Sequence, residues 1–180
     1  VVCGSGPAGM FCAYFLAQAG YCPIILERGE AVEERSRTVE RFFAGGALNT
    51  ESNVQFGEGG AGTFSDGKLN TMVKDTYGRI RKVLEVFVQA GAPEEILYQN
   101  KPHIGTDRLR TVVAAIREQI KAWGGEFCFG TKLVDIRWAS LGDASAGFGT
   151  GKLAALTPDG TGPKQGKLFG LVCRTGEREW

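Results

Sequence analysis

The chain has 180 residues, of which 43% are hydrophobic and 23% are charged, and its formal net charge at pH 7 is +1. These values are ordinary for a globular protein of one domain or one and a half. They give no electrostatic reason to expect binding to nucleic acid or to an anionic membrane, and no apolar run is long enough for a membrane span.

Residues 1–27 predict a strand, a glycine-rich turn, a helix and a second strand. The turn reads Gly4-Ser5-Gly6-Pro7-Ala8-Gly9, an apolar run typical of a helix follows, and the second strand ends at Glu27. A GxGxxG turn in this βαβ context, with an acid about 20 residues further on, is the fingerprint of a dinucleotide-binding fold. The alternative is a structural turn in an ordinary α/β domain, and the strand, helix and acid around the turn favour the nucleotide site.

Each position of this turn has a physical role in holding a nucleotide. Gly4 allows the tight turn, Gly6 lets a pyrophosphate approach the backbone, and Gly9 lets the helix pack closely on the strand. Pro7 and Ala8 open the helix, whose first N–H groups and partial positive charge are expected to face the phosphates.

The end of the second strand predicts the ribose contact. Glu27 lies where a carboxylate accepts hydrogen bonds from both ribose hydroxyls, and Arg28 follows it. One arginine at that place does not establish a preference for a nucleotide with a 2′-phosphate.

A second glycine-rich stretch follows a predicted surface helix over residues 30–43, which the i,i+4 pair Glu33 and Arg37 supports. Residues 51–69 have neither helical nor strand periodicity and hold five glycines between Gly57 and Gly67. Successive backbone N–H groups freed by glycine conformations make anion-binding sites. A flexible linker is the alternative, but apolar residues spaced along the stretch favour a fixed loop that contacts a ligand.

The rest of the chain predicts two longer helices and several strands. Helices are expected over residues 77–90 and from a cap at Thr106 or Asp107 to residue 123, with a short helical start at 92–95. Strands are expected over residues 126–138, with a step at 130–131, and over residues 167–174. A Gly/Ala-rich loop or hairpin is expected between them, over residues 139–166.

Two long and specific motifs lie at residues 51–69, ESNVQFGEGGAGTFSDGKL, and at residues 101–109, KPHIGTDRL. Together with the order of the elements, they resemble a largely uncharacterised family of FAD-dependent dehydrogenases found in bacteria and plastid-bearing eukaryotes. That family belongs to the glutathione-reductase structural class, in which the first βαβ unit holds the ADP part of FAD. The resemblance covers residues 1–136 and fades beyond residue 138.

The resemblance implies an α/β, Rossmann-like FAD/NAD(P)-binding fold with a βαβ start, an inserted helical and loop segment, and a β-meander. It implies a partial FAD-binding domain over residues 1–138, with residues 44–105 inserted. Residues 139–180 are then an incomplete Gly/Ala-rich loop and meander strand, and both ends of the chain are expected to be truncated. The motif Gly142-Asp143-Ala144 is discounted as the closing flavin segment because it comes too early in the chain.

By position, the first glycine turn corresponds to the family's pyrophosphate turn and Glu27 to its ribose acid. The resemblance also implies contacts from a second glycine cluster to the pyrophosphate and flavin side, and a backbone contact to adenine. The cluster residues are Gly59, Gly60, Gly62 and Thr63, and the adenine residue is Leu133.

The implied function is that of an FAD-dependent oxidoreductase, a dehydrogenase in which the flavin carries the hydride chemistry. FAD is the expected cofactor and NAD(P)H a candidate electron donor, while the substrate and the catalytic residues are not readable. The chain alone is expected to be inactive. The alternatives are a non-catalytic scaffold of the same fold, as in Rab-escort and GDP-dissociation-inhibitor proteins, and an NAD(P)-binding module.

The remaining chemical groups give weaker indications. His103, the only histidine, is a candidate general acid, although a structural role before a helix is favoured. Lys68 is a candidate for biasing the flavin, against the simpler interpretation of a solvated lysine in a turn. No metal-ligand spacing is present. The five cysteines show no CxxC spacing and favour a reducing compartment such as the cytoplasm or the plastid stroma, although the compartment itself is not identified.

Overall fold

The computed structural model describes residues 1–69, 71, 74–140 and 166–179. The chain forms two units, Val1–Gly130 and Thr131–Trp180, each of which is described by itself. The loop expected over residues 139–166 and the motif at residues 142–144 lie almost wholly outside the described residues.

The first unit is built on a parallel sheet of three strands, β1 (Val2–Cys3), β2 (Ile24–Leu26) and β3 (Glu126–Cys128). β2 lies in the middle and pairs with β1 on one side and β3 on the other. The helix α1 (Pro7–Gln18) connects β1 to β2, as parallel neighbours require a crossover. This arrangement confirms the predicted α/β class and the Rossmann-like start.

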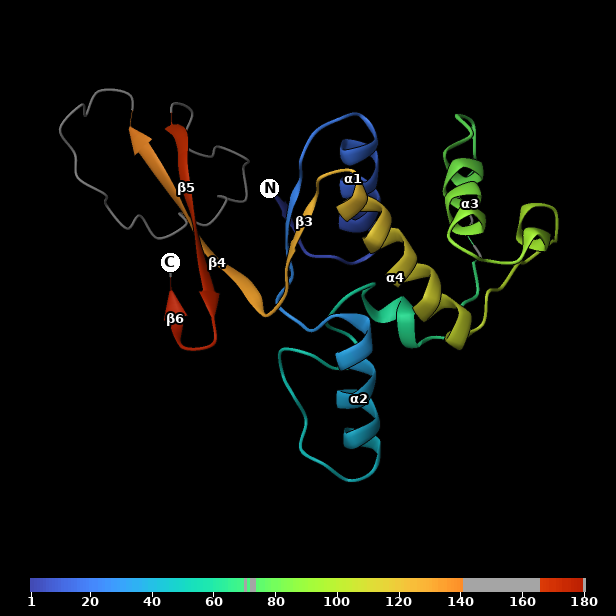
Figure 1. Ribbon diagram of the computed structural model, residues 1–180, viewed down its shortest axis with the longest axis horizontal. Helices are drawn as coiled ribbons and strands as arrows, with labels where there is room; N and C mark the ends of the chain where they lie inside the picture. The colour runs from blue at the N-terminus through green and yellow to red at the C-terminus, as the bar shows by residue number, and fades with distance from the viewer. Residues whose placement is uncertain (70, 72–73, 141–165, 180) are drawn as a thin grey trace. The chain divides into compact units, whose positions relative to one another are not determined.

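The core of the first unit lies where α1 meets α4 (Thr106–Ala122), which run next to each other in Figure 1. Apolar residues of α4 recur at spacings of three and four, which buries one face of the helix. On α1, Ala13 and Ala17 are buried, and their small side chains allow the close approach. The core residues of α4 are Leu109, Val112, Val113, Ile116 and Ile120.

Four further elements complete the first unit: α2 (Val32–Phe43), η1 (Ala61–Phe64), α3 (Arg79–Gln89) and η2 (Glu94–Leu97). The helices predicted over residues 30–43, 77–90 and 106–123 are thereby confirmed, with small differences at their ends. The stretch over residues 51–69, which was expected to be irregular throughout, contains the single 3-10 turn η1.

Two local predictions are wrong. α4 has Gly105 at its N-cap, so Thr106 is already the first helical residue, and its hydroxyl donates to the Ser65 carbonyl oxygen at 2.7 Å. Arg37 pairs with Glu34 rather than with Glu33. Glu33 is engaged by an arginine on α4, described below.

The second unit is an antiparallel meander of β4 (Thr131–Ser140), β5 (Gly166–Thr175) and β6 (Arg178–Glu179). The strand expected over residues 126–138 is therefore two strands in two different sheets, β3 and β4. They are separated at Gly130, whose φ is +62°. The predicted step at residues 130–131 thus corresponds to a complete break, and the predicted meander is present.

Candidate functional site

The first glycine turn has the geometry that a close backbone approach requires. Gly4 has a φ of +90°, and its N–H donates to the Leu26 carbonyl oxygen at 2.7 Å, which ties the turn to β2. A Cβ atom on Gly9 would overlap the Gly4 carbonyl oxygen, whereas a Cβ on Gly6 would meet nothing within 4 Å. Gly9 is therefore required by internal packing, and Gly6 faces open space into which a ligand fits.

The N-terminus of α1 starts at this turn. Its N-cap is Gly6, which has no side chain to bond the first N–H groups, and Pro7 occupies the first turn. The first N–H groups of any α-helix have no partner within the helix, and they carry part of its positive dipole. The turn thus presents backbone donors and partial positive charge, which suits a phosphate.

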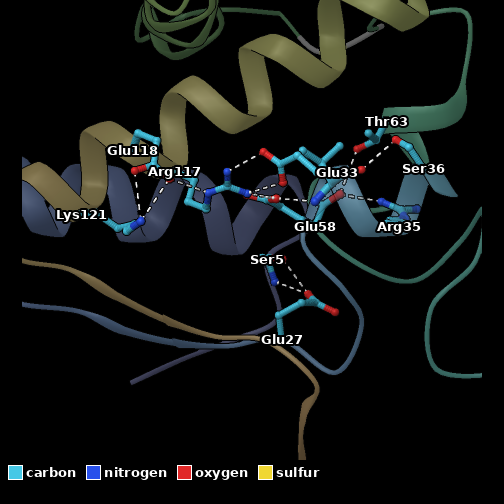
Figure 2. Close-up of polar contacts among 11 residues, drawn as sticks. Ser5, Glu27, Glu33, Arg35, Ser36, Glu58, Thr63, Arg117, Glu118 and Lys121 are labelled. Carbon is cyan, nitrogen blue, oxygen red and sulfur yellow. Dashed lines mark hydrogen bonds and ion pairs between the residues drawn. The ribbon is translucent and has the colours of Figure 1, made fainter. Parts of the chain in front are cut away.

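Glu27 is buried, with 5% of its surface exposed, and it braces the turn. One carboxylate oxygen accepts from the Ser5 N–H and the Ser5 hydroxyl, both at 2.7 Å (Figure 2). The other accepts from the Gly29 N–H at 2.8 Å. A carboxylate that only binds ribose hydroxyls would face the ligand, outside the packed interior. Glu27 is instead part of the turn's own structure, so its removal will also cost stability.

The second glycine cluster, residues 57–63, lies directly against the first turn. The Gly59 N–H donates to the Ser5 carbonyl oxygen at 2.9 Å. A Cβ atom on Gly60 would lie 3.2 Å from Pro7 Cδ and 3.3 Å from Gly6 Cα. Gly59 and Gly60 have φ values of +77° and +67°, which side chains disfavour. The structure therefore brings together two segments that are separated by about 50 residues in sequence.

The two family motifs also pair with each other. The Leu69 N–H donates to the Pro102 carbonyl oxygen at 2.9 Å, and the Ile104 N–H donates to the Gly67 carbonyl oxygen at 3.0 Å. Lys68 and His103 face each other across this short antiparallel bridge. These bonds, with the buried Ser52, Glu58 and Thr63, make the stretch a packed loop, so the linker interpretation is wrong.

Three buried charged residues that the sequence reasoning missed surround the second cluster (Figure 2). Arg35 of α2 donates to the carbonyl oxygens of Asn53 at 2.9 Å, Glu58 at 2.5 Å and Gly60 at 2.9 Å. Arg117 of α4 donates to Glu58 Oε2 at 2.6 Å and pairs with Glu33 at 2.7 Å. Glu58 Oε2 also accepts from the Val32 N–H at 2.7 Å.

Burial shifts the pKa values in this group. Glu58 is fully buried, which raises its pKa to about 7 although Val32 and Arg117 bind its charged form. Burial lowers the pKa of Arg35 to about 10, against the attraction of Glu27 and Glu58. Hydrogen bonds from Arg117 lower the pKa of the half-exposed Glu33. Burying these charged groups beside the glycine cluster therefore costs desolvation free energy.

A pocket of about 450 Å³ opens beside both glycine segments. Pro7 and Ala8 line it from the start of α1, Gly62 and Thr63 from the second cluster, and α3 and α4 supply mostly apolar walls. A Cβ atom on Gly62 would meet nothing within 4 Å, so the cluster is open on this side. Lys68 also lines the pocket, with its ammonium group paired to Asp66 at 2.7 Å.

The structure gives partners to three other predicted residues, Arg28, Thr63 and Leu133, of which Thr63 also lines the pocket. The Arg28 guanidinium stacks on the Phe56 ring at 3.7 Å and donates to the Thr50 carbonyl oxygen at 3.2 Å. Thr63 donates its hydroxyl to the Glu58 carbonyl oxygen at 3.1 Å. Leu133 pairs with Cys173 in the second unit, and its expected contact with adenine stays a prediction, as do the other predicted cofactor contacts.

The described residues offer neither a metal site nor a membrane-spanning helix. Among them, no cluster of three or more histidine, cysteine, aspartate or glutamate side chains has the geometry of a metal site. No helix in this part of the chain has the length and apolar character needed to cross a bilayer.

Comparison with known proteins gives a consistent family. A family model described as FAD binding domain matches residues 1–155. An uncharacterized protein of Clostridium beijerinckii is 57% identical over 138 residues, which are 77% of this chain and 26% of that protein. The chain thus spans about a quarter of the length of this relative.

One solved structure has a similar fold. The crystal structure of Thermovibrio ammonificans THI4 is similar over 96% of this chain and 46% of its own chain, with a TM-score of 0.50 and 15% sequence identity. At that identity the similarity supports the fold alone. Together with the family match, it confirms the expected FAD-binding fold.

Proposed function

The chain belongs to the FAD binding domain family, and we propose that it holds the ADP half of FAD in an FAD-dependent oxidoreductase. The observation that carries this proposal is the contact between the two glycine segments. Gly59 is bonded to Ser5, and Gly60 lies over Gly6 and Pro7, at the N-terminus of α1. Two sets of glycine backbone at one helix N-terminus suit a pyrophosphate, which carries two phosphate groups in sequence.

The residues present fit such a cofactor on steric grounds. Gly6 and Gly62 both have open space where a side chain would stand. Gly62 lines the pocket, and Gly6 directly precedes Pro7, which also lines it. Glu27 directly follows β2 and lies beside the turn, where the resemblance places the ribose hydroxyls. Because its oxygens already accept three hydrogen bonds, the ribose would share this carboxylate with Ser5 and Gly29.

In this proposal, FAD supplies the hydride-transfer chemistry when it is bound. The chain's own residues bind and orient it: the glycine segments and α1 hold the pyrophosphate, Glu27 holds the ribose, and the apolar wall of the pocket excludes water. NAD(P)H is the proposed electron donor, and the substrate would be set by parts of the protein beyond these residues.

The test is the absorbance spectrum of the purified full-length protein, followed by release and identification of its chromophore. We expect a flavin band in the visible range and FAD as the released molecule, with NAD(P)H oxidation by the holoenzyme. A colourless protein that binds a nicotinamide nucleotide would favour the NAD(P)-binding module. A protein with neither ligand would favour the non-catalytic scaffold.

A further inference from the structure

We infer that Arg35 is a positioning residue for the cofactor: it turns the second glycine cluster so that the backbone donors of the cluster face the first glycine turn. The inference rests on the proposed function and adds to it a residue of α2 outside both glycine motifs. Figure 2 shows this residue near Glu58 and Thr63, on a different element from Glu27, which follows β2.

In the part of the chain that the structure describes, the hydrogen-bond partners of Arg35 are all backbone groups. Arg35 is completely buried, and each hydrogen bond found for it among the described residues goes to a backbone carbonyl oxygen, those of Asn53, Glu58 and Gly60. The aliphatic part of the side chain lies against Gly57, where a Cβ atom would come within 2.5 Å of Arg35 Cδ. One side chain thus fixes the backbone just before the cluster and within it.

The carbonyl groups that Arg35 binds fix the direction of the next N–H groups in the cluster. In a planar trans peptide the C=O and N–H groups point in opposite directions. The Glu58 carbonyl points to Arg35, and the N–H of the same peptide, on Gly59, points away and reaches the Ser5 carbonyl oxygen of the first turn. The Gly60 carbonyl also points to Arg35, so the N–H of Ala61 is directed away from the guanidinium in the same sense.

Arg35 also places a buried positive charge behind the cluster. Arg35 Nη2 has no hydrogen-bond partner among the described residues, and the guanidinium makes no ion pair there at hydrogen-bond distance. The guanidinium also lies over the Phe64 ring, 4.7 Å from its centre, but it has no carboxylate at hydrogen-bond distance among the described residues, and burying such a cation is costly. Behind a glycine cluster, however, its positive charge favours an anionic ligand such as a pyrophosphate on the opposite side.

The experiment compares Arg35→Met, Arg35→Lys and the matched control Arg37→Met in the full-length protein. Arg37 is on the same helix, but it is exposed and pairs only with the exposed Glu34 among the described residues. For each variant, the FAD dissociation constant is measured at a temperature where thermal unfolding shows that the apoprotein is fully folded. A purely structural role would lower the melting temperature and leave this constant unchanged.

We expect Arg35→Met to weaken FAD binding about tenfold or more, and Arg37→Met to change it less than about twofold. Arg35→Lys keeps the charge but lacks the fork that reaches three carbonyl oxygens, so it should recover only part of the affinity. Wild-type affinity in Arg35→Met would overturn the inference, and so would full recovery in Arg35→Lys.

If Arg35→Met does not fold, Arg35→Lys decides the matter alone: weaker FAD binding in folded protein supports positioning, and wild-type affinity contradicts it. Failure of the proposed function gives a different result. In that case the wild-type protein itself would be purified without flavin and would not bind added FAD.

Discussion

The two glycine-rich segments of the site, residues 4–9 and residues 57–63, lie against each other but are held in place by different means. The first is held within the opening βαβ unit: Gly4 bonds to Leu26 of the next strand, Gly9 packs on Gly4, and Glu27 accepts hydrogen bonds from Ser5. The second is held by buried charged side chains from two helices, Arg35 and Arg117, together with its own Glu58. A local motif is thus enough to specify the first segment, whereas the second depends on tertiary partners.

The largest effect should separate two glycines of the first segment. Gly9→Ala places a Cβ on the Gly4 carbonyl oxygen, so we expect a loss of about 3 kcal/mol in the free energy of unfolding. Gly6→Ala should cost less than about 1 kcal/mol, because the φ of Gly6 is −66° and its Cβ would meet nothing. Urea unfolding of the two variants measures both values, and equal losses would show that the close packing at Gly9 is not what holds the turn.

The next prediction concerns Glu27, which links the turn to its proposed ligand. A charge-assisted hydrogen bond contributes about 1.5–3 kcal/mol, so Glu27→Ala should weaken FAD binding by roughly 10- to 150-fold. Because Ser5 and Gly29 would lose their acceptor, the unfolding free energy should also fall by about 1–3 kcal/mol.

The matched control for this prediction is Glu40→Ala, which removes an exposed carboxylate on α2. It should leave both FAD affinity and stability nearly unchanged. Titration of flavin fluorescence gives the dissociation constants. If Glu27→Ala loses stability but binds FAD as tightly as Glu40→Ala, the carboxylate is a brace of the turn and not the ribose acid.

The buried charges of the second segment predict a dependence of stability on pH. Burial raises the pKa of Glu58 in the folded protein from its ordinary 4.5 to about 7. Between these values the folded state binds more protons at Glu58 than the unfolded state does, so the contribution of this group to stability falls as pH rises from 4.5 to 7. Through this group, we expect the free energy of unfolding to fall by about 1–3 kcal/mol over that range.

Glu58→Gln should abolish that part of the slope, which urea unfolding at pH 5, 6, 7 and 8 would reveal. Glu33→Gln is the matched control, because Arg117 lowers the pKa of Glu33 and its titration therefore lies below this range. An unchanged slope in Glu58→Gln would mean that the carboxylate stays charged throughout, held by Arg117 and Val32.

The same contrast explains what could be predicted from the sequence. Glycine spacing, helical periodicity and the acid at Glu27 are local, and they gave the βαβ unit, the helices and both glycine segments. Glu58 and Arg117 are 59 residues apart, and nothing in a local pattern tells which of many charged residues becomes buried. For the same reason Glu33 was assigned to Arg37 four residues away rather than to Arg117.

The break at Gly130 shows a related limit. Residues on both sides have strand-like side chains, and periodicity alone cannot tell that β3 joins a parallel sheet and β4 an antiparallel one. A glycine at that point was the available signal, because a φ of +62° is incompatible with a continuous strand. It was interpreted as a step within one strand.

The most direct test asks whether the two glycine segments form one FAD site. It is a double-mutant cycle of FAD dissociation constants in the full-length protein, with Gly6→Ala, Gly60→Ala and the double variant. Since a Cβ on Gly60 would lie 3.3 Å from Gly6 Cα, each single variant should weaken FAD binding, and the two effects should be coupled by about 1 kcal/mol. Effects that add within about 0.3 kcal/mol, or wild-type affinity in either single variant, would contradict a shared site.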